Sequence, residues 1–150
     1  KENNVNIVIL RIPIVVGINS STGNMLTDFI KEAKNKSEIT IFGDGKHKRK
    51  FIYQDDLTSI IVKISLNWRK FKKYEVFNIP GFICSASELA RKIKKQIKGD
   101  IKINYLSNKP NAFSLTSKSI KIMKSYNINL KTNLNKMIKI LVKSSLWRKK

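Results

Sequence analysis

The residues best suited to chemistry lie in one stretch, residues 43–56, which reads GDGKHKRKFIYQDD. This stretch follows a short apolar run, opens with a Gly-Asp-Gly turn, and places Arg49 just before a second apolar run. A guanidinium offers a fork of hydrogen-bond donors that can hold two phosphate oxygens at once. The pattern therefore predicts a phosphate-binding turn between two strands, with Arg49 as its cation.

Other side chains with reactive or metal-binding potential are scarce. The chain has one histidine, His47, and one cysteine, Cys84, so it can form no intrachain disulfide. These two residues are also too few for the usual nitrogen and sulfur ligand sets, and we predict no metal site. Nothing in the sequence pairs Cys84 with a base, so we expect a small buried apolar residue rather than a nucleophile.

The elements that must position Arg49 follow from the apolar patterns. Runs rich in Ile, Val and Phe predict strands, the first of them buried, at residues 5–12, 39–42, 51–53, 75–79 and 101–105. Helical spacing and capping residues predict helices that begin at residues 24, 55 and 85 and further helices at 117–126 and 134–147. This order is an α/β pattern without an internal repeat or a linker, so we expect a single unit.

The formal charge of +21 comes mostly from lysine rather than arginine. Lysine, asparagine and isoleucine are all abundant, and their AT-rich codons account for much of the charge without a polyanionic partner. Surfaces that read bases favour arginine forks and exposed aromatic side chains, which are scarce here. The composition therefore disfavours nucleic acid as a partner, although a lysine-rich binder of polyanions is kept as an alternative.

The sequence shows no membrane or export signal. No apolar run approaches the roughly 20 residues that span a bilayer, and no signal peptide is visible. With its single cysteine the chain fits a reducing compartment, and we expect a cytoplasmic protein without a membrane partner. The chain starts at Lys1 rather than at a methionine, which suggests that a segment upstream is missing.

Four blocks in order resemble the NAD-dependent epimerase/dehydratase family, the extended short-chain dehydrogenases that act on nucleotide sugars. The blocks are LRIPIVVG at residues 10–17, IFGDG with the Arg49-to-Asp56 stretch, VFNI at 76–79 with the helix behind it, and the weaker KPN at 109–111. The resemblance implies an α/β fold, namely the C-terminal part of an NAD(P)-binding, Rossmann-type epimerase/dehydratase with its smaller substrate-binding lobe. Residues 1–150 would be this single C-terminal portion, without the N-terminal dinucleotide-binding part.

The resemblance also implies roles for single residues. Arg49 would contact the substrate diphosphate and Asn78 the nucleotide sugar, although an exposed surface cation and an asparagine that satisfies nearby backbone are the plainer alternatives. Asn24 and Met25 would line the substrate from the start of a helix. The remaining implied contacts are backbone groups of Ile41 and Phe42 at the nucleotide base, Lys109 at a phosphate, and Ile12 and Pro13 beside the cofactor.

Asp56 has a structural interpretation. We expect it to cap the helix that it begins and to tie down the turn that holds Arg49. Several positions depart from the pattern of the family. Ile14 replaces an asparagine, Lys50 an aspartate and Lys109 an arginine, while Asn111 replaces a loop glycine. A lysine at position 109 would offer a point charge instead of a fork.

The catalytic parts of the family are missing from this sequence. Its six glycines form no G-x-G-x-x-G spacing for a dinucleotide. The one Tyr-x-x-x-Lys, Tyr105 to Lys109, follows an alternating strand and runs into Pro110, so it is not the helical catalytic pair. We therefore expect no catalytic residue here. NAD or NADP would serve the complete enzyme, and we do not expect either to bind this chain alone.

The sequence thus predicts part of an NAD-dependent nucleotide-sugar epimerase or dehydratase, or a related reductase, that is not competent by itself. The expected partners are the nucleotide sugar, the missing N-terminal half or a second chain, and a second copy in a homodimer of the full enzyme. The alternatives are a non-catalytic binding module, a degenerate remnant of the family and the polyanion binder named above. An exposed apolar edge along residues 5–12 would favour an incomplete unit or a module.

Overall fold

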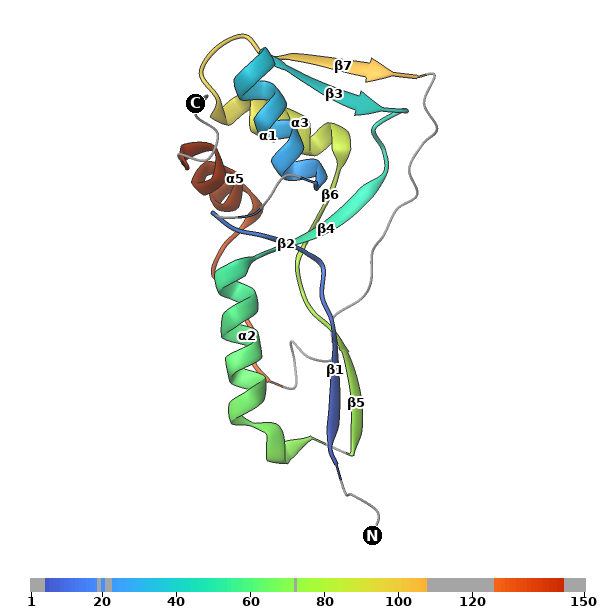
Figure 1. The fold of residues 1–150 in the computed structure, drawn as a ribbon, viewed down its shortest axis with the longest axis vertical. Helices are drawn as coiled ribbons and strands as arrows, with labels where there is room; N and C mark the ends of the chain where they lie inside the picture. The colour runs from blue at the N-terminus through green and yellow to red at the C-terminus, as the bar shows by residue number, and fades with distance from the viewer. Residues whose placement is uncertain (1–4, 19, 21–22, 72, 108–125, 145–150) are drawn as a thin grey trace.

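The computed structural model describes residues 5–18, 20, 23–71, 73–107 and 126–144. The strands among them are β1 Ile7–Arg11, β2 Ile14–Val16, β3 Glu38–Phe42, β4 Lys48–Tyr53, β5 Tyr74–Asn78, β6 Phe82–Ser85 and β7 Lys102–Leu106. The helices are α1 Met25–Lys36, α2 Gln54–Leu66, the 3-10 turn η1 Trp68–Lys70, α3 Ala86–Gln96 and α5 Leu134–Lys143. The chain is elongated, with α1, α3 and α5 at one end and α2 at the other (Figure 1).

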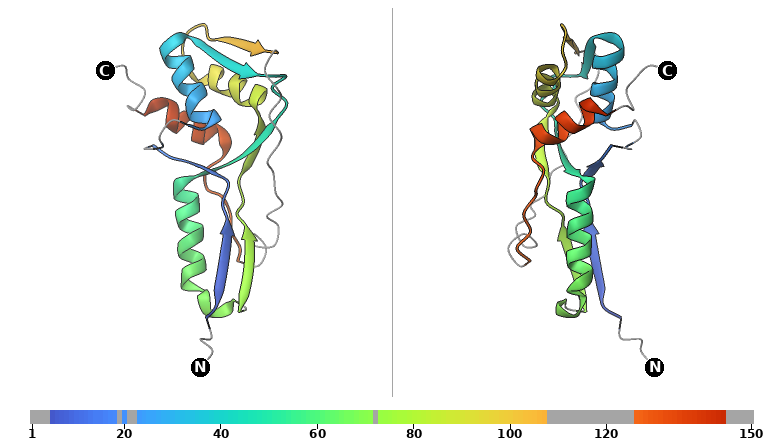
Figure 2. Two further views of the ribbon diagram at one scale, coloured as in Figure 1. Left: turned by 45° about the vertical axis from the view of Figure 1, so that its right-hand side comes forward. Right: turned by 90° about the vertical axis from the view of Figure 1, so that its left-hand side faces the viewer.

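The strands pair in three small sheets. β1 pairs with β5 and β3 with β7, both in parallel, while β4 is the middle strand between parallel β2 and antiparallel β6. Figure 2 shows the β1–β5 pair beside α2 at one end and the β3–β7 pair beside α1 at the other. The chain passes between the two ends through β2, β4 and β6, which makes the middle sheet the connection between them.

Two hydrophobic clusters bury the apolar side chains, and β4 contributes to both. Phe51 and Tyr53 belong to the cluster under α1, α3 and α5, whereas Ile52, between them, belongs to the cluster beside α2. Successive side chains of a strand point to opposite faces, so β4 is buried on both sides. The α2 cluster also includes edge-to-face contacts between Phe71 and Phe77, whose ring centroids are 5.7 Å apart.

Side-chain caps begin three of the helices. Asn24 accepts a hydrogen bond from the Thr27 backbone N–H at 3.1 Å, and Ser85 accepts one from the Glu88 N–H at 3.2 Å. Asn133 caps α5 by accepting from the Lys136 N–H at 2.8 Å. Such caps satisfy backbone donors that the first turn of a helix leaves without partners. The helix starts predicted at residues 24 and 85 are therefore confirmed.

The turn between β3 and β4 is fixed by its backbone and by α3. Gly43 and Gly45 have φ values of 71° and 70°, a region that L residues other than glycine rarely adopt. A Cβ at Gly45 would lie 2.2 Å from Ser87 Oγ. The Ser87 N–H donates to the Gly45 carbonyl at 3.0 Å and the Ala86 N–H to the His47 carbonyl at 3.2 Å. The turn that leads to Arg49 is thus attached to the start of α3.

The prediction of a buried strand at residues 5–12 is wrong. β1 alternates between exposed and half-buried residues, and Ile7 and Ile9 are 48% and 40% exposed. Val8 and Leu10 pack against the α2 cluster, whereas Ile7 and Ile9 alternate with them along the strand and stay exposed on the opposite face. The prediction of a strand is therefore confirmed, and only its burial was overestimated.

Smaller differences concern short strands and the second helix. β2 and β6 were not predicted, because three or four residues are too few to show an alternation. Ile61 of α2 is exposed, and the helix ends before Trp68, which lies in η1. The helix expected at residues 117–126 falls almost wholly outside the described residues, as does the end of the one expected at 134–147.

Asp56 is structural, but not in the way the sequence suggested. No side chain caps α2, and the hydrogen bonds of Asp56 go to Lys131 and Thr132 instead of to the turn before Arg49. Its buried carboxylate accepts the N–H groups of Lys131 and Thr132 at 2.9 and 3.1 Å. Asp56 therefore fastens the segment that leads into α5, a contact between residues 75 positions apart that no local pattern could reveal.

Candidate functional site

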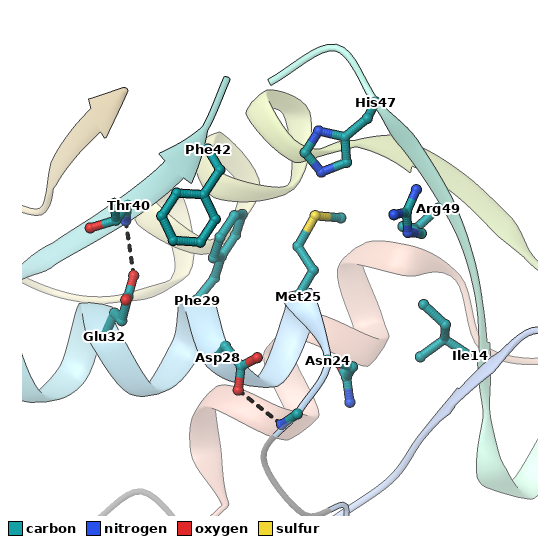
Figure 3. A pocket seen from close by; sticks show the side chains of 11 residues that line it. Ile14, Asn24, Met25, Asp28, Phe29, Glu32, Thr40, Phe42, His47 and Arg49 are labelled. Atoms are coloured by element: carbon teal, nitrogen blue, oxygen red, sulfur yellow. Dashed lines mark hydrogen bonds between the residues drawn. The ribbon is translucent and has the colours of Figure 1, made fainter. Parts of the chain in front are cut away.

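A cavity of about 680 Å³ lies between α1 and the segment that runs from β3 through the turn into β4. Figure 3 shows α1 residues on one side of this cavity, with Phe42, His47 and Arg49 on the other. The lining residues come from five segments that the fold brings together: Ile14, Gly23, Asn24, Met25, Asp28, Phe29, Glu32, Thr40, Phe42, His47 and Arg49.

The α1 wall combines apolar side chains with two carboxylates that accept backbone hydrogen bonds. Asp28 accepts a hydrogen bond from the Gly23 N–H at 3.0 Å, and Glu32 accepts one from the Thr40 N–H at 2.9 Å (Figure 3). Asp28 and Glu32 are one helical turn apart, so they share a face of α1. Both carboxylates thus fix backbone at the edges of the cavity.

The opposite wall carries an exposed aromatic ring and two basic side chains. Phe42, the last residue of β3, is 55% exposed, whereas its neighbour Ile41 is fully buried. His47 and Arg49 are two residues apart at the start of β4, and both line the cavity. The Arg49 Nη1 donates to the Lys48 carbonyl at 3.1 Å, which holds the guanidinium beside its own strand.

His47 is the most unusual polar group of this wall. Its Nδ1 is buried and has no hydrogen-bond partner in the described part of the chain. Burial lowers the pKa of His47 below its ordinary value, and the Arg49 guanidinium lowers it further, while the Asp44 carboxylate opposes the shift. These surroundings favour the neutral imidazole, because burial and Arg49 together outweigh the Asp44 carboxylate.

The structure brings four of the predicted substrate residues to this one cavity. Asn24, Met25, Phe42 and Arg49 all line it. The Ile41 side chain does not, because it points into the core, which leaves only its backbone for the role expected of it.

The other predicted residues lie elsewhere. Asn78 ends β5 opposite Arg11, while Ile12 and Pro13 connect β1 to β2, and none of the three lines the cavity. Lys109 lies outside the described residues.

Sequence reasoning did not select several lining residues. Asp28 and Glu32 follow Met25 at spacings of three and seven on the same helix, which is a signal that could have found them. His47 precedes Arg49 by two positions, the spacing of side chains on one face of a strand. Thr40 gave no such signal, because its contribution is the backbone N–H bound by Glu32.

Two buried residues, Lys50 and Cys84, lie behind the cavity wall and do not line the cavity. Lys50 is buried, and its Nζ donates to the Ile79 carbonyl at 3.3 Å. Burial lowers the pKa of Lys50. Cys84 pairs with Arg49 in the β4–β6 register and is also buried, so its prediction as a small core residue is confirmed. Burial and then the Glu88 carboxylate raise the pKa of the Cys84 thiol to about 12, against the opposing effect of Lys92.

Further sites of other kinds are not evident within the described residues. No group of three His, Cys, Asp or Glu side chains there could hold a metal ion. Tyr105 lies on β7 and donates its hydroxyl hydrogen bond to Ser87 Oγ at 3.1 Å, so it is not on a helix with a lysine one turn away. No helix in the described part of the chain is long and apolar enough to cross a membrane.

The fold is an α/β fold that matches Rossmann-type epimerases and dehydratases. The sequence model of the NAD dependent epimerase/dehydratase family matches residues 1–80, and the chain belongs to this family. The family resemblance found in the sequence is thereby confirmed. A comparison with curated proteins finds no match.

Solved structures support the same fold. UDP-glucuronic acid 4-epimerase from Bacillus cereus, solved with UDP-glucuronic acid and NAD, is 24% identical with a TM-score of 0.75 over 90% of this chain and 43% of its own. UDP-N-acetylglucosamine 4-epimerase from Methanobrevibacter ruminantium M1, solved with UDP-N-acetylmuramic acid, is 23% identical with a TM-score of 0.71 over 91% and 44%. MoeE5, solved with UDP-glucuronic acid and NAD, is 17% identical with a TM-score of 0.78 over 95% and 46%. The chain therefore spans less than half of the length of these proteins.

The described residues do not fit a complete dinucleotide site. Such a site needs a glycine-rich turn between a strand and a helix, so that the pyrophosphate can approach the helix N-terminus. Of the described helices, α1 follows a cap at Asn24, α2 follows β4 directly and α3 follows β6 directly. Ile12 and Pro13 could offer apolar contacts to one side of a cofactor, but the described residues supply no cradle for it.

Proposed function

We propose that this chain is the C-terminal, substrate-binding portion of an NAD-dependent nucleotide-sugar epimerase or dehydratase, or of a related reductase. In this proposal the cavity between α1 and the segment from β3 to β4 holds the nucleotide diphosphate. The observation that carries the proposal is that Arg49 and an exposed Phe42 line the same cavity as Asn24 and Met25. These are the residue types that a charged diphosphate and a planar base require.

The size and chemistry of the cavity support this assignment. Small-molecule sites commonly measure roughly 300–1,000 Å³ and combine apolar walls with a few placed polar groups. A guanidinium presents five N–H donors in a planar fork, a geometry that suits the oxygens of a diphosphate. Asn24 uses its Oδ1 in capping α1, while its amide NH₂ can donate to a ligand. Phe42 offers an aromatic face for a base.

The exposed face of β1 supports the view that the complete protein contains more than this chain. Five large apolar side chains on and next to β1 and on β2 are between 38% and 58% exposed, namely Val5, Ile7, Ile9, Ile12 and Val15. In our proposal an N-terminal dinucleotide-binding half, or a second chain that supplies it, covers this face. That half would hold NAD or NADP and the groups that react with the sugar, and we assign no catalytic step to the residues described here.

Three finer points belong to the same proposal. Asn78 and Lys109 would contact the nucleotide sugar in the complete enzyme, where a homodimer is the expected assembly. A free buried Cys84 and a cytoplasmic location are mutually consistent.

A non-catalytic binding module is the second candidate, because the described residues include no helical Tyr–Lys pair. Both candidates share the cavity and differ only in what the missing part contributes.

Calorimetric titration of the chain with UDP-glucuronic acid tests the binding site. Replacing Arg49 by Gln should weaken binding about 10- to 100-fold, because hydrogen bonds to charged groups contribute about 1.5–3 kcal/mol. Lys46→Gln is the matched control, since Lys46 is a highly exposed cation of the same turn. Absence of binding, or equal affinities of the Arg49 and Lys46 variants, would contradict the proposal. Binding that disappears steeply with added salt in all variants would instead indicate a general polyanion binder.

A further inference from the structure

The only histidine of the chain has an unsatisfied ring nitrogen at a wall of the cavity. The His47 Nδ1 is buried without a hydrogen-bond partner in the part of the chain that the structure describes. The His47 side chain lines the cavity on the same wall as Arg49 (Figure 3). Buried polar atoms in native structures nearly always have a partner, so an exception at a binding cavity points to a group that arrives with the ligand.

We propose that His47 is a second contact of the anion bound by Arg49, and that its imidazole takes up a proton as the anion enters. This inference rests on the proposed function, because the anion is the diphosphate of the nucleotide sugar. A neutral imidazole has one donor and one acceptor nitrogen, whereas an imidazolium donates from both. Phosphate oxygens only accept hydrogen bonds, so the protonated ring suits them better than the neutral ring does.

The charged groups around His47 favour a link between its protonation and the binding of an anion. Arg49 on β4 and burial disfavour the imidazolium, while Asp44 in the turn favours it. The carboxylates of the α1 wall, Asp28 and Glu32, each already accept a backbone hydrogen bond.

The remaining charged neighbours lie toward solvent or have partners of their own. Lys46 forms a 3.7 Å ion pair with Asp44, and Lys48 is exposed. At the start of α3, Glu88 pairs with Lys92 at 3.7 Å. The group able to change the balance at His47 is therefore the ligand itself. A bound diphosphate offsets the charge of Arg49 and thereby favours the imidazolium.

Protonation and binding must then reinforce each other. If the anion raises the pKa of His47, protonation of His47 tightens anion binding by the same factor. The affinity for the anion therefore increases as pH falls from the pKa of His47 in the complex to its lower pKa in the free protein. Outside this interval the affinity is constant. Each unit between the two values corresponds to about a tenfold change in affinity.

The single histidine allows a direct test by NMR. The ring protons of His47 are titrated in the full chain between about pH 5 and pH 8, the range of histidine, without and with saturating UDP-glucuronic acid. The diphosphate diester and the carboxylate of this ligand do not titrate in that range, so the protein supplies any linked proton. We expect a midpoint below the ordinary histidine value in the free chain and a midpoint at least about one unit higher in the complex.

Calorimetry on variants separates this inference from the proposed function. His47→Gln, with His47→Asn as a second variant, should bind the ligand with an affinity that no longer depends on pH. Lys46→Gln removes an exposed cation from the same turn and should keep the pH dependence of the original chain. Binding that depends on Arg49 while the His47 midpoint stays unchanged, or a His47→Gln variant with the original pH dependence, overturns only the role of His47. No binding at any pH overturns the proposed function, and this inference with it.

Discussion

The Ser87 backbone N–H donates a 3.0 Å hydrogen bond to the carbonyl of Gly45, and this contact joins the β3–β4 turn to the first turn of α3. The two residues are 42 positions apart in the chain. Because His47 and Arg49 follow Gly45 by two and four positions, the position of both basic side chains depends on how closely this turn approaches α3. The contact therefore links helix packing to the geometry of the candidate site.

Gly45→Ala should destabilise the fold and weaken ligand binding. The φ of 70° is unfavourable for alanine by about 1–2 kcal/mol. The added Cβ would also lie 2.2 Å from Ser87 Oγ, so the turn or the serine has to move. We expect the free energy of unfolding to fall by about 1–3 kcal/mol, measured by urea denaturation.

Gly99→Ala provides the matched control for this glycine. Gly99 has a φ of 117°, but a Cβ there meets nothing within 4 Å. The control should therefore lose stability through backbone strain alone and leave binding of UDP-glucuronic acid unchanged. If Gly45→Ala bound the ligand as tightly as Gly99→Ala does, the turn would not need its close contact with Ser87 to position Arg49.

Asp56→Asn should reduce stability although it changes only one atom. Both carboxylate oxygens of Asp56 accept backbone N–H groups, from Lys131 and Thr132, and an amide presents a donor to one of them. We expect a loss of about 2–4 kcal/mol in the free energy of unfolding, since buried donors lose a charged partner. Asp55→Asn changes an exposed neighbour in the same turn of α2 and should stay within about 0.5 kcal/mol. Equal effects of the two variants on the free energy of unfolding would show that the hydrogen bonds of Asp56 do not stabilise the fold.

Cys84 should react slowly with thiol reagents in the folded chain. Its pKa of about 12 leaves almost no thiolate near neutral pH, and its side chain is buried. Iodoacetamide labelling followed by mass spectrometry should therefore be slow at pH 8 and should accelerate strongly in denaturant. Rapid labelling of the folded chain would contradict the buried position assigned to Cys84.

The same pKa predicts how Cys84 affects stability at alkaline pH. Its folded-state pKa lies above the ordinary thiol value, so the folded chain retains a proton that the unfolded chain releases. The stabilising contribution of the neutral thiol is present below the unfolded-state value and is lost as pH rises toward about 12. Cys84→Ala should remove this component of the alkaline decline in a pH series of urea denaturations.

Local patterns were sufficient where local chemistry decides the structure. The caps at Asn24 and Ser85, the turn at Gly43 and Gly45 and the strand at residues 51–53 all follow from residue types at fixed spacing, although β4 begins earlier, at Lys48, and includes Arg49. For the same reason the sequence identified Arg49, because a lone arginine at a glycine turn is a local signal.

Tertiary contacts determined the features that the sequence did not predict. The exposure of Ile7 and Ile9 depends on which strands lie beside β1, and composition alone cannot reveal this. The bonds of Asp56 to Lys131 and Thr132 join distant segments. The unsatisfied Nδ1 of His47 likewise arises only when the turn packs against the start of α3.

The burial of β4 on both faces has a consequence for specificity. Strand register admits only whole-residue steps, and a slip of one residue exchanges the two faces of the strand. Such a slip would move Ile52 out of the cluster beside α2 and turn Phe51 away from the cluster under α1. Arg49 shares its face with Phe51 and Tyr53, so two separate cores jointly forbid the misalignment that would point the guanidinium away from the cavity. The direction of the Arg49 side chain is thus determined by apolar residues of β4 that do not line the cavity.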